Sequence, residues 1–200
     1  MLAFVSSFFL MIITPGPGVL TTAGIGAGFG WPAGIRFLVG LCIGTNLTFL
    51  MVATGLVASI DAIPGLRTGL LIASVAYFLY LAAKIALAGA RVGFIQPDRA
   101  PTLWTGIGLQ LVNPKAYVVN GLLVTGFPFY PQDLMVEVAW KFLLMNLVWV
   151  PVHLAWLGAG VGLRRLELSP ALQRTINVAM AIALVIVVLT AAFHLQTTPA

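Results

Sequence analysis

The stretch Thr14-Pro15-Gly16-Pro17-Gly18 interrupts an apolar run near the start of the chain, and Asn113-Pro114-Lys115 interrupts another in the second half. Pro15 and Pro114 lie 99 positions apart in a chain of 200 residues, so each break has a similar place in its half. In lipid, a broken helix survives only where protein or a water-filled cavity surrounds the break, because unsatisfied backbone groups are costly there. Two matching breaks predict a small transporter with a substrate site near the bilayer midplane.

The composition predicts an all-α integral membrane protein. The chain is 60% hydrophobic and 8% charged, with a mean hydropathy of +1.07. Apolar stretches of about 20 residues, long enough to cross a bilayer, recur along it and leave no room for a soluble domain. We expect one transmembrane domain over residues 1–200, with six spans near Leu2–Gly28, Phe37–Ile60, Thr68–Leu87, Leu103–Phe127, Val138–Gly160 and Thr175–Leu195.

The basic residues predict the orientation. Arg67 and Lys141 fall at the second and fourth connections, and neither terminus carries a basic side chain. Six arginines fall in the first, third and fifth connections: Arg36, Arg91, Arg99, Arg164, Arg165 and Arg174. Short loops rich in Lys and Arg face the cytoplasm, so both termini should lie on the periplasmic or extracellular side. This distribution along loops also argues against a nucleic-acid partner for the net charge of +5.

An internal repeat follows from the same positions. Three spans precede the long connection Gly89–Thr102 and three follow it, so related halves must lie in opposite orientations. Asn46-Leu47 recurs as Asn146-Leu147, 100 positions later. The sequence therefore predicts a 3+3 inverted repeat of residues 1–88 and 103–195, with broken first and fourth helices.

The breaks also predict a binding chemistry. Asn113 suits a helix N-cap and Pro114 the first helical position, so a half-helix should start there and offer the N–H groups of Lys115, Ala116 and Tyr117. The Gly16-Pro17 pair can start a half-helix in the same way and offer the N–H groups of Gly18, Val19 and Leu20. A helix N-terminus binds anions, so a carboxylate is the expected ligand.

Lys115 strengthens this prediction. A cation at the bilayer centre costs about 2.5–3.5 kcal/mol on insertion scales, so such residues usually face inward and are functional. One reading is that Lys115 pairs with a substrate carboxylate or changes protonation during transport. The other is that it snorkels or pairs with an acidic neighbour to stabilise the bundle, although no acidic residue lies in a predicted span centre.

Other intramembrane polar residues allow two readings each. Asn46 and Asn146 either line the substrate pathway or hydrogen-bond between helices. His153 either relays protons or is a packing residue. Gln110, Tyr117 and Asn120 share the fourth span, one face of which is expected to line the cavity. Glycine pairs such as Gly40 and Gly44 favour close helix packing or a homodimer.

The sequence resembles the lysine-exporter, or LysE/RhtB-type, family of small bacterial amino-acid efflux carriers. The resemblance covers essentially the whole chain and rests on five segments. They are Pro15-Gly16-Pro17, Gly30-Trp31-Pro32-Ala33-Gly34-Ile35-Arg36, Ala76-Tyr77-Phe78-Leu79-Tyr80-Leu81 with Lys84, Val112-Asn113-Pro114-Lys115-Ala116, and Arg174-Thr175-Ile176-Asn177. The resemblance implies a six-span exporter of amino acids or related metabolites in the bacterial inner membrane, driven by the proton gradient. In that family a polar residue usually follows Pro-Gly-Pro, whereas here Gly18 does, which leaves no acidic partner for a substrate ammonium.

Rival classes find less support. An enzyme would need a nucleophile or metal constellation, and no HExxH or GxSxG motif is present. Cys42 is the only cysteine, so an internal disulfide and a thiolate metal cluster are excluded, and no cofactor is implied. A metal-ion or other small-solute exporter would want more metal-ligating side chains in the spans. A structural membrane protein would explain the glycine pairs but not the paired breaks with Lys115.

Overall fold

The computed structural model describes the chain except for residues 15, 56–65, 88–100, 164–168 and 198–200. The described residues form helices and short connections without a strand, which confirms the predicted all-α class. The helices are α1 (Leu2–Ile13), α2 (Pro17–Ala53), α4 (Leu66–Ala86), α5 (Leu103–Leu111), α6 (Pro114–Thr125), α7 (Leu134–Leu163) and α8 (Pro170–Thr197).

Both predicted helix breaks are present. Helix α1 ends at Ile13, Thr14 has an extended backbone, and α2 begins at Pro17. Helix α5 ends at Leu111, and α6 begins at Pro114 directly after its N-cap, Asn113. Proline fixes φ and lacks an N–H, so it can open a helix but cannot continue one. Pro15 itself lies outside the described residues.

The first connection differs from the prediction. We expected a linker between spans ending at Gly28 and starting at Phe37, but helix continues through this segment. Only Gly30 leaves the helical conformation, with φ 74°, and two helices therefore meet at a corner inside α2. This left-handed backbone region is accessible to glycine at little cost, and Pro32 then sits in the first turn of the next helical part.

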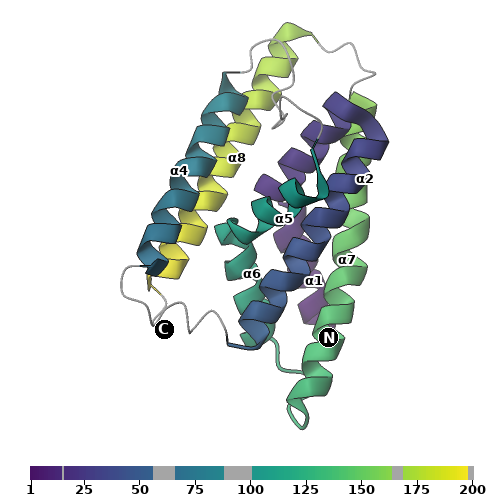
Figure 1. Ribbon diagram of the computed structural model, residues 1–200, viewed down its shortest axis with the longest axis vertical. Helices are drawn as coiled ribbons and strands as arrows, with labels where there is room; N and C mark the ends of the chain where they lie inside the picture. The colour runs from purple at the N-terminus through teal and green to yellow at the C-terminus, as the bar shows by residue number, and fades with distance from the viewer. Residues whose placement is uncertain (15, 56–65, 88–100, 164–168, 198–200) are drawn as a thin grey trace.

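The helices run up and down along one long axis, so that α1 begins and α8 ends at the same end of the molecule (Figure 1). Helices α4 and α8 lie side by side as a pair, and α6 connects this pair to the rest. Helix α2 is central, because it packs against α5, α6 and α7. Pro17 and Gly18 at the first break and Asn113 and Pro114 at the second are buried among these helices.

Glycines bring the helices close together at the end that holds the Gly30 corner. A side chain at Gly40 would collide with the backbone of Leu103 on α5, and one at Gly160 on α7 would collide with the backbone carbonyl of Ala23. Backbones that approach this closely leave room only for glycine. Substitution at either position would push α5 or α7 away from α2.

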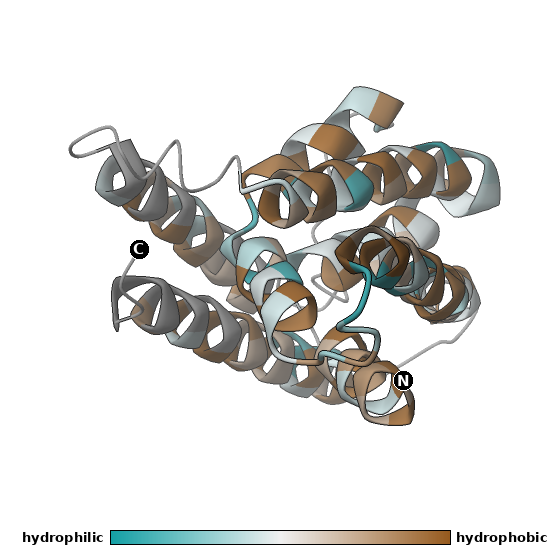
Figure 2. Cartoon of the chain, turned by 90° about the horizontal axis from the view of Figure 1, so that it is seen from below, coloured by the Kyte–Doolittle hydropathy of each residue, from teal (hydrophilic) through white to brown (hydrophobic). Residues whose placement is uncertain are grey.

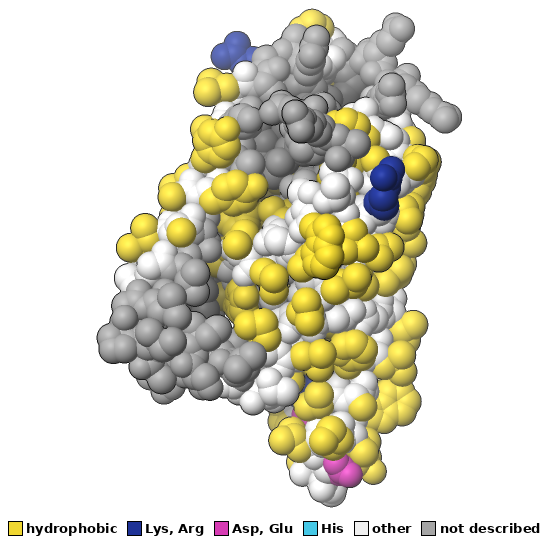
Figure 3. Space-filling model, in the orientation of Figure 1, with side chains coloured by type: hydrophobic (Ala, Val, Ile, Leu, Met, Phe, Trp, Pro, Cys, Tyr) yellow, Lys and Arg dark blue, Asp and Glu magenta, His cyan; other side chains and the backbone are white. Residues whose placement is uncertain are grey.

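The outer surface is apolar over most of its height. Leu10, Ile72 and Leu147, on three different helices, are all mostly exposed. On the face in Figure 3, hydrophobic side chains cover the middle, while Lys and Arg appear in the upper part and Asp and Glu at the lower tip. Figure 2 shows hydrophobic residues on outward as well as inward faces of the helices it colours. Soluble monomers rarely expose so large an apolar surface.

Two described helices, α2 and α7, are long and apolar enough to cross a membrane. That test alone is weak, since a buried core helix can pass it. The exposed apolar surface is the stronger argument, because a soluble core helix would hide its apolar side chains. Together these features indicate a membrane protein.

Candidate functional site

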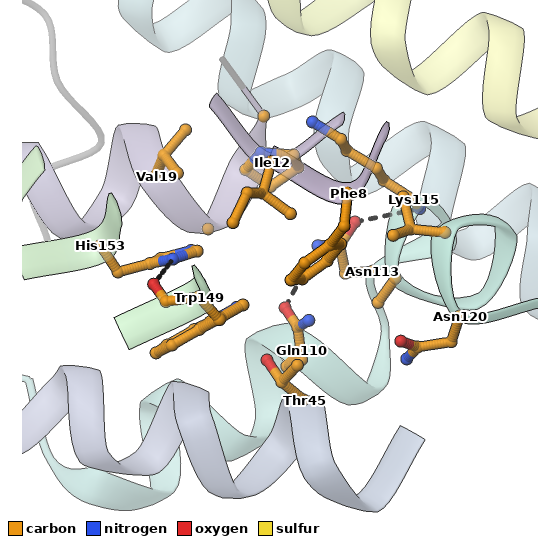
Figure 4. Close-up of a pocket in the computed structure, with 15 residues that line it drawn as sticks. Phe8, Ile12, Val19, Thr45, Gln110, Asn113, Lys115, Asn120, Trp149 and His153 are labelled. Atoms are coloured by element: carbon orange, nitrogen blue, oxygen red, sulfur yellow. Dashed lines mark hydrogen bonds between the residues drawn. The ribbon is translucent and has the colours of Figure 1, made fainter. Parts of the chain in front are cut away.

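A small cavity of about 50 Å³ lies where the two helix breaks meet. It is large enough for a few water molecules in the conformation described here. Helices α1, α2, α5, α6 and α7 all contribute to it (Figure 4). The lining residues are Phe8, Ile12, Gly16, Pro17, Gly18, Val19, Thr45, Gln110, Asn113, Lys115, Ala116, Val119, Asn120, Trp149 and His153.

The second break satisfies its own polar groups. The Asn113 side-chain oxygen accepts a hydrogen bond from the Lys115 N–H at 3.1 Å, and the Asn113 carbonyl accepts one from the Ala116 N–H at 3.0 Å. The Asn113 amide donates to the Gln110 side-chain oxygen at 3.3 Å. The Tyr117 hydroxyl reaches back across the break to the Leu111 carbonyl at 2.8 Å.

These bonds correct one prediction. We expected the N–H groups of Lys115 and Ala116 to be open to a ligand, but Asn113 uses both. The reason is local, because an N-cap side chain competes with any ligand for the first N–H groups of its helix. The Tyr117 side chain bonds across the break and does not line the cavity. Two of the three N–H groups predicted to contact a ligand at the start of α6 are therefore already bonded within the break.

The first break has no side-chain cap. Gly16 is the N-cap of α2 and has no side chain with which to cap it. The N–H group of Gly18 has no hydrogen-bond acceptor among the described residues, and both Gly18 and Val19 line the cavity. The positive end of the α2 dipole thus faces the cavity without a cap.

Lys115, in the second half of the chain, donates a hydrogen bond to the first break. Its Nζ donates to the Thr14 carbonyl at 2.9 Å, at the end of α1. The same Nζ lies 3.1 Å from where a Cβ of Gly16 would be, beside the start of α2. An ammonium group has three N–H donors, and the described residues accept one hydrogen bond from this one. No carboxylate is found among the described lining residues, so the cavity carries positive charge at this point.

His153 faces the cavity from α7 in a fixed orientation. Its Nδ1 lies 3.0 Å from the Trp149 carbonyl oxygen, and the two rings stack with centroids 3.7 Å apart (Figure 4). A carbonyl can only accept a hydrogen bond, so Nδ1 carries the proton of a neutral ring and Nε2 is an acceptor. His153 is only 5% exposed.

Asn46 and Asn146 lie outside the cavity lining and bond to each other. The Asn46 amide donates to the Asn146 oxygen at 3.2 Å, and the Asn146 amide donates to the Asn46 oxygen at 2.9 Å. This reciprocal pair joins α2 to α7. A role in substrate binding stays a prediction for these two residues, while their contact fits the alternative, a hydrogen bond between helices. Pro114 is buried beside the cavity without lining it.

Several lining residues carried no clear signal in the sequence. Phe8, Ile12 and Trp149 form the apolar wall and resemble any other apolar residue of a span. Gln110 and Asn120 were expected on a cavity-lining face, and both are there. Asn120 also donates to the Thr48 hydroxyl at 2.9 Å, which fixes α6 against α2.

A buried ion pair lies at the end of the molecule near the α6–α7 connection. Glu137 and Lys141, on successive turns of α7, lie 2.7 Å apart and are 5% and 1% exposed. Glu137 accepts the N–H groups of Phe129 and Tyr130, and Lys141 donates to the Val124 carbonyl at 2.7 Å. Lys141 is thus a buried residue and not the loop cation that we counted when predicting the orientation.

Comparison with known proteins shows two similar chains. Two relatives are cysteine/O-acetylserine efflux proteins, one of Salmonella paratyphi A (strain ATCC 9150 / SARB42) and one of Salmonella typhi. Each is 27% identical over 159 residues, which span 79% of this chain and 80% of the relative. The chain is similar to amino-acid efflux proteins. This similarity confirms the resemblance seen in the motifs, and these relatives are transporters, not enzymes.

No protein-family model matches the chain, and no solved structure matches it significantly. The similarity to efflux proteins and the apolar outer surface together place the chain in a membrane.

Proposed function

We propose that this protein exports small amino acids or closely related metabolites across the bacterial inner membrane. The observation that carries the proposal is the pairing of Lys115 with the uncapped start of α2 at the cavity. Two positive groups side by side near the bilayer midplane repel each other unless an anion binds between them. The carboxylate of an amino acid is such an anion, and the relatives are named for the efflux of two amino acids.

The binding site that we propose consists of Gly16, Pro17 and Gly18 at the first break, with Asn113 and Lys115 at the second. The N–H groups of Gly18 and Val19 and the Lys115 ammonium would contact the carboxylate. Asn113 would hold Lys115 in place by capping α6. Phe8, Ile12 and Trp149 line the cavity and would contact the substrate side chain.

The proposed architecture is a six-span inverted repeat. Two pairs of equivalent residues support it, since Gly16 and Lys115 are 99 positions apart and in contact, and Asn46 and Asn146 are 100 positions apart and in contact. In a two-fold arrangement, residues on the axis meet their own equivalents. Proton-coupled alternating access of the two halves around this axis is the mechanism that we propose, with both termini in the periplasm.

The test is efflux from solute-loaded vesicles that contain the purified protein, with a panel of amino acids headed by L-cysteine and O-acetyl-L-serine. We expect proton-gradient-dependent efflux, reduced at least 10-fold by Lys115→Ala. Lys115→Arg is the matched control, because it keeps a cation in the same place and should retain part of the activity. If Lys115→Ala transports as well as the wild type, Lys115 is a structural anchor. If no amino acid moves, the proposed function is wrong.

A further inference from the structure

The proposed site contacts a carboxylate but leaves the other charged group of an amino acid, its ammonium, without a partner. No described lining residue is acidic. An ammonium group buried without acceptors would lose its hydration, which is a large cost. The lining must therefore supply neutral acceptors if an amino acid is to bind as a zwitterion.

Two such acceptors converge on the space beside Gly18. A Cβ placed on Gly18 would lie 3.9 Å from the His153 Nε2 and 3.9 Å from the Gln110 side-chain oxygen. Both atoms belong to side chains that are more than nine-tenths buried and that come from different helices, α7 and α5. The absence of a side chain at Gly18 leaves the space between them open.

The His153 nitrogen is available to a ligand. Its other ring nitrogen donates to the Trp149 carbonyl, and stacking on the Trp149 ring prevents the imidazole from turning away. Among the described residues, Nε2 has no hydrogen-bond partner. A neutral imidazole held in this way presents one lone pair, in one direction.

The Gln110 oxygen has one acceptor position left. Among the described residues it accepts one hydrogen bond, from the Asn113 amide at 3.3 Å, and an amide oxygen can accept two. That bond also fixes which end of the Gln110 amide faces the cavity, because Asn113 in turn is held by its capping bond to Lys115. The oxygen is thereby oriented by the second break.

We propose that His153 Nε2 and the Gln110 side-chain oxygen, on either side of Gly18, form the subsite that accepts the substrate ammonium. This inference rests on the proposed function and identifies the substrate as a zwitterionic α-amino acid. The two subsites are adjacent, because Lys115 lies beside Gly16 and the acceptors lie beside Gly18, two residues along the same turn of α2. An α-amino acid carries its two charged groups on one carbon and fits this spacing.

The experiment compares L-cysteine with 3-mercaptopropionate, which has the same carboxylate and thiol but no ammonium. Binding of each is measured by titration calorimetry on the purified full-length protein in detergent. The wild type should bind L-cysteine at least 10-fold more tightly. His153→Phe keeps an aromatic ring against Trp149 but removes the acceptor, so it should lose at least 10-fold in L-cysteine affinity while 3-mercaptopropionate affinity changes less than twofold.

A second variant guards against a folding defect in His153→Phe. Gly18→Ala puts a methyl group into the proposed ammonium position with only ordinary contacts of 3.4 to 3.9 Å, so the fold should tolerate it. The alanine keeps the backbone N–H that we assign to the carboxylate, so it should weaken L-cysteine binding at least 10-fold and 3-mercaptopropionate binding much less. Gly108→Ala is the matched control, since a Cβ there meets nothing within 4 Å.

The outcomes separate the two proposals. If the wild type binds both ligands equally, or if Gly18→Ala and every folded His153 variant weaken both ligands equally, the ammonium subsite is wrong and the carboxylate site stands. If the wild type binds neither ligand, nor any other small amino acid, both proposals fail.

Discussion

The two helix breaks occupy similar positions in the two halves of the sequence, but they differ in how their backbone groups are capped and hydrogen-bonded. The break at Asn113 is closed, because its own side chains cap α6 and bridge back to α5. The break at Gly16 has no cap and depends on Lys115, from the other half, to satisfy the Thr14 carbonyl. The second break is therefore bonded by side chains of its own half, whereas the first break depends on a side chain of the other half.

This difference indicates that the two halves have different roles at the site. A closed break holds its neighbours rigidly, so α5 and α6 can fix the positions of Gln110, Asn113 and Lys115. The uncapped start of α2 places the N–H group of Gly18, which has no acceptor among the described residues, at the cavity. Binding sites gain affinity when rigid groups hold the ligand, because less ordering entropy is lost on binding.

The largest effect is expected when the open break is closed. Gly16→Ser would supply α2 with a side-chain cap like that of α6, and its oxygen would accept a hydrogen bond from the N–H group of Gly18 or Val19. The new Cβ would also lie 3.1 Å from the Lys115 side chain, whose flexible end can shift. We expect transport to fall at least 10-fold in vesicles, while stability rises by only a few tenths of a kcal/mol.

The control for this variant is Gly121→Ala on α6, where a new Cβ meets nothing within 4 Å. If Gly16→Ser transports like the wild type, the N–H groups at the start of α2 do not bind substrate. The contrast between the two breaks would then be structural only.

An intermediate effect is expected when the closed break is opened. Asn113→Ala removes the cap on Lys115 N–H and the bond to Gln110, and the loss of an N-cap costs about 1 kcal/mol. Thermal unfolding in detergent should show this loss, and Asn113→Ser should recover much of it by capping α6 again. An Asn113→Ala protein as stable as the wild type would contradict the view that this break is held by its cap.

The smallest effect is expected at the bridge across the closed break. Tyr117→Phe removes only the hydroxyl that donates to the Leu111 carbonyl, and such bonds in membrane proteins are worth about 0.6 kcal/mol. Unfolding should show a small loss of stability, with transport nearly unchanged. Transport that falls as far as in Lys115→Ala would place Tyr117 among the binding residues.

The breaks could be predicted because their cause is local. Proline, glycine and asparagine act on the backbone within a few residues, so their sequence position alone indicates where helices end and begin. The same reasoning did not predict that Asn113 closes its own break, although it placed Asn113 at the N-cap. We expected a ligand at the N–H groups of Lys115 and Ala116, but Asn113 already accepts a hydrogen bond from each.

The partners across the bundle could not be predicted, because they depend on which helices pack together. Lys115 bonds to a backbone carbonyl, which any residue has, and the sequence contains no signal for it. The Asn46–Asn146 pair is partly an exception, since the repeated dipeptide marked both residues without showing that they meet. Glu137 and Lys141 have the spacing of neighbours on a helix, but only the structure shows that the α6–α7 connection buries them.

The way Lys115 is satisfied has an electrical consequence. Its partner is a neutral carbonyl, so while it carries its proton the site has a net positive charge, and a zwitterionic amino acid, whose own two charges cancel, leaves that net charge unchanged. One elementary charge moved across a potential of 100 mV is worth about 2.3 kcal/mol. The Glu137–Lys141 pair has no net charge, and its displacement is electrically silent. If Lys115 moves across part of the membrane field during transport, the voltage therefore acts on that step whether or not a zwitterionic substrate is bound.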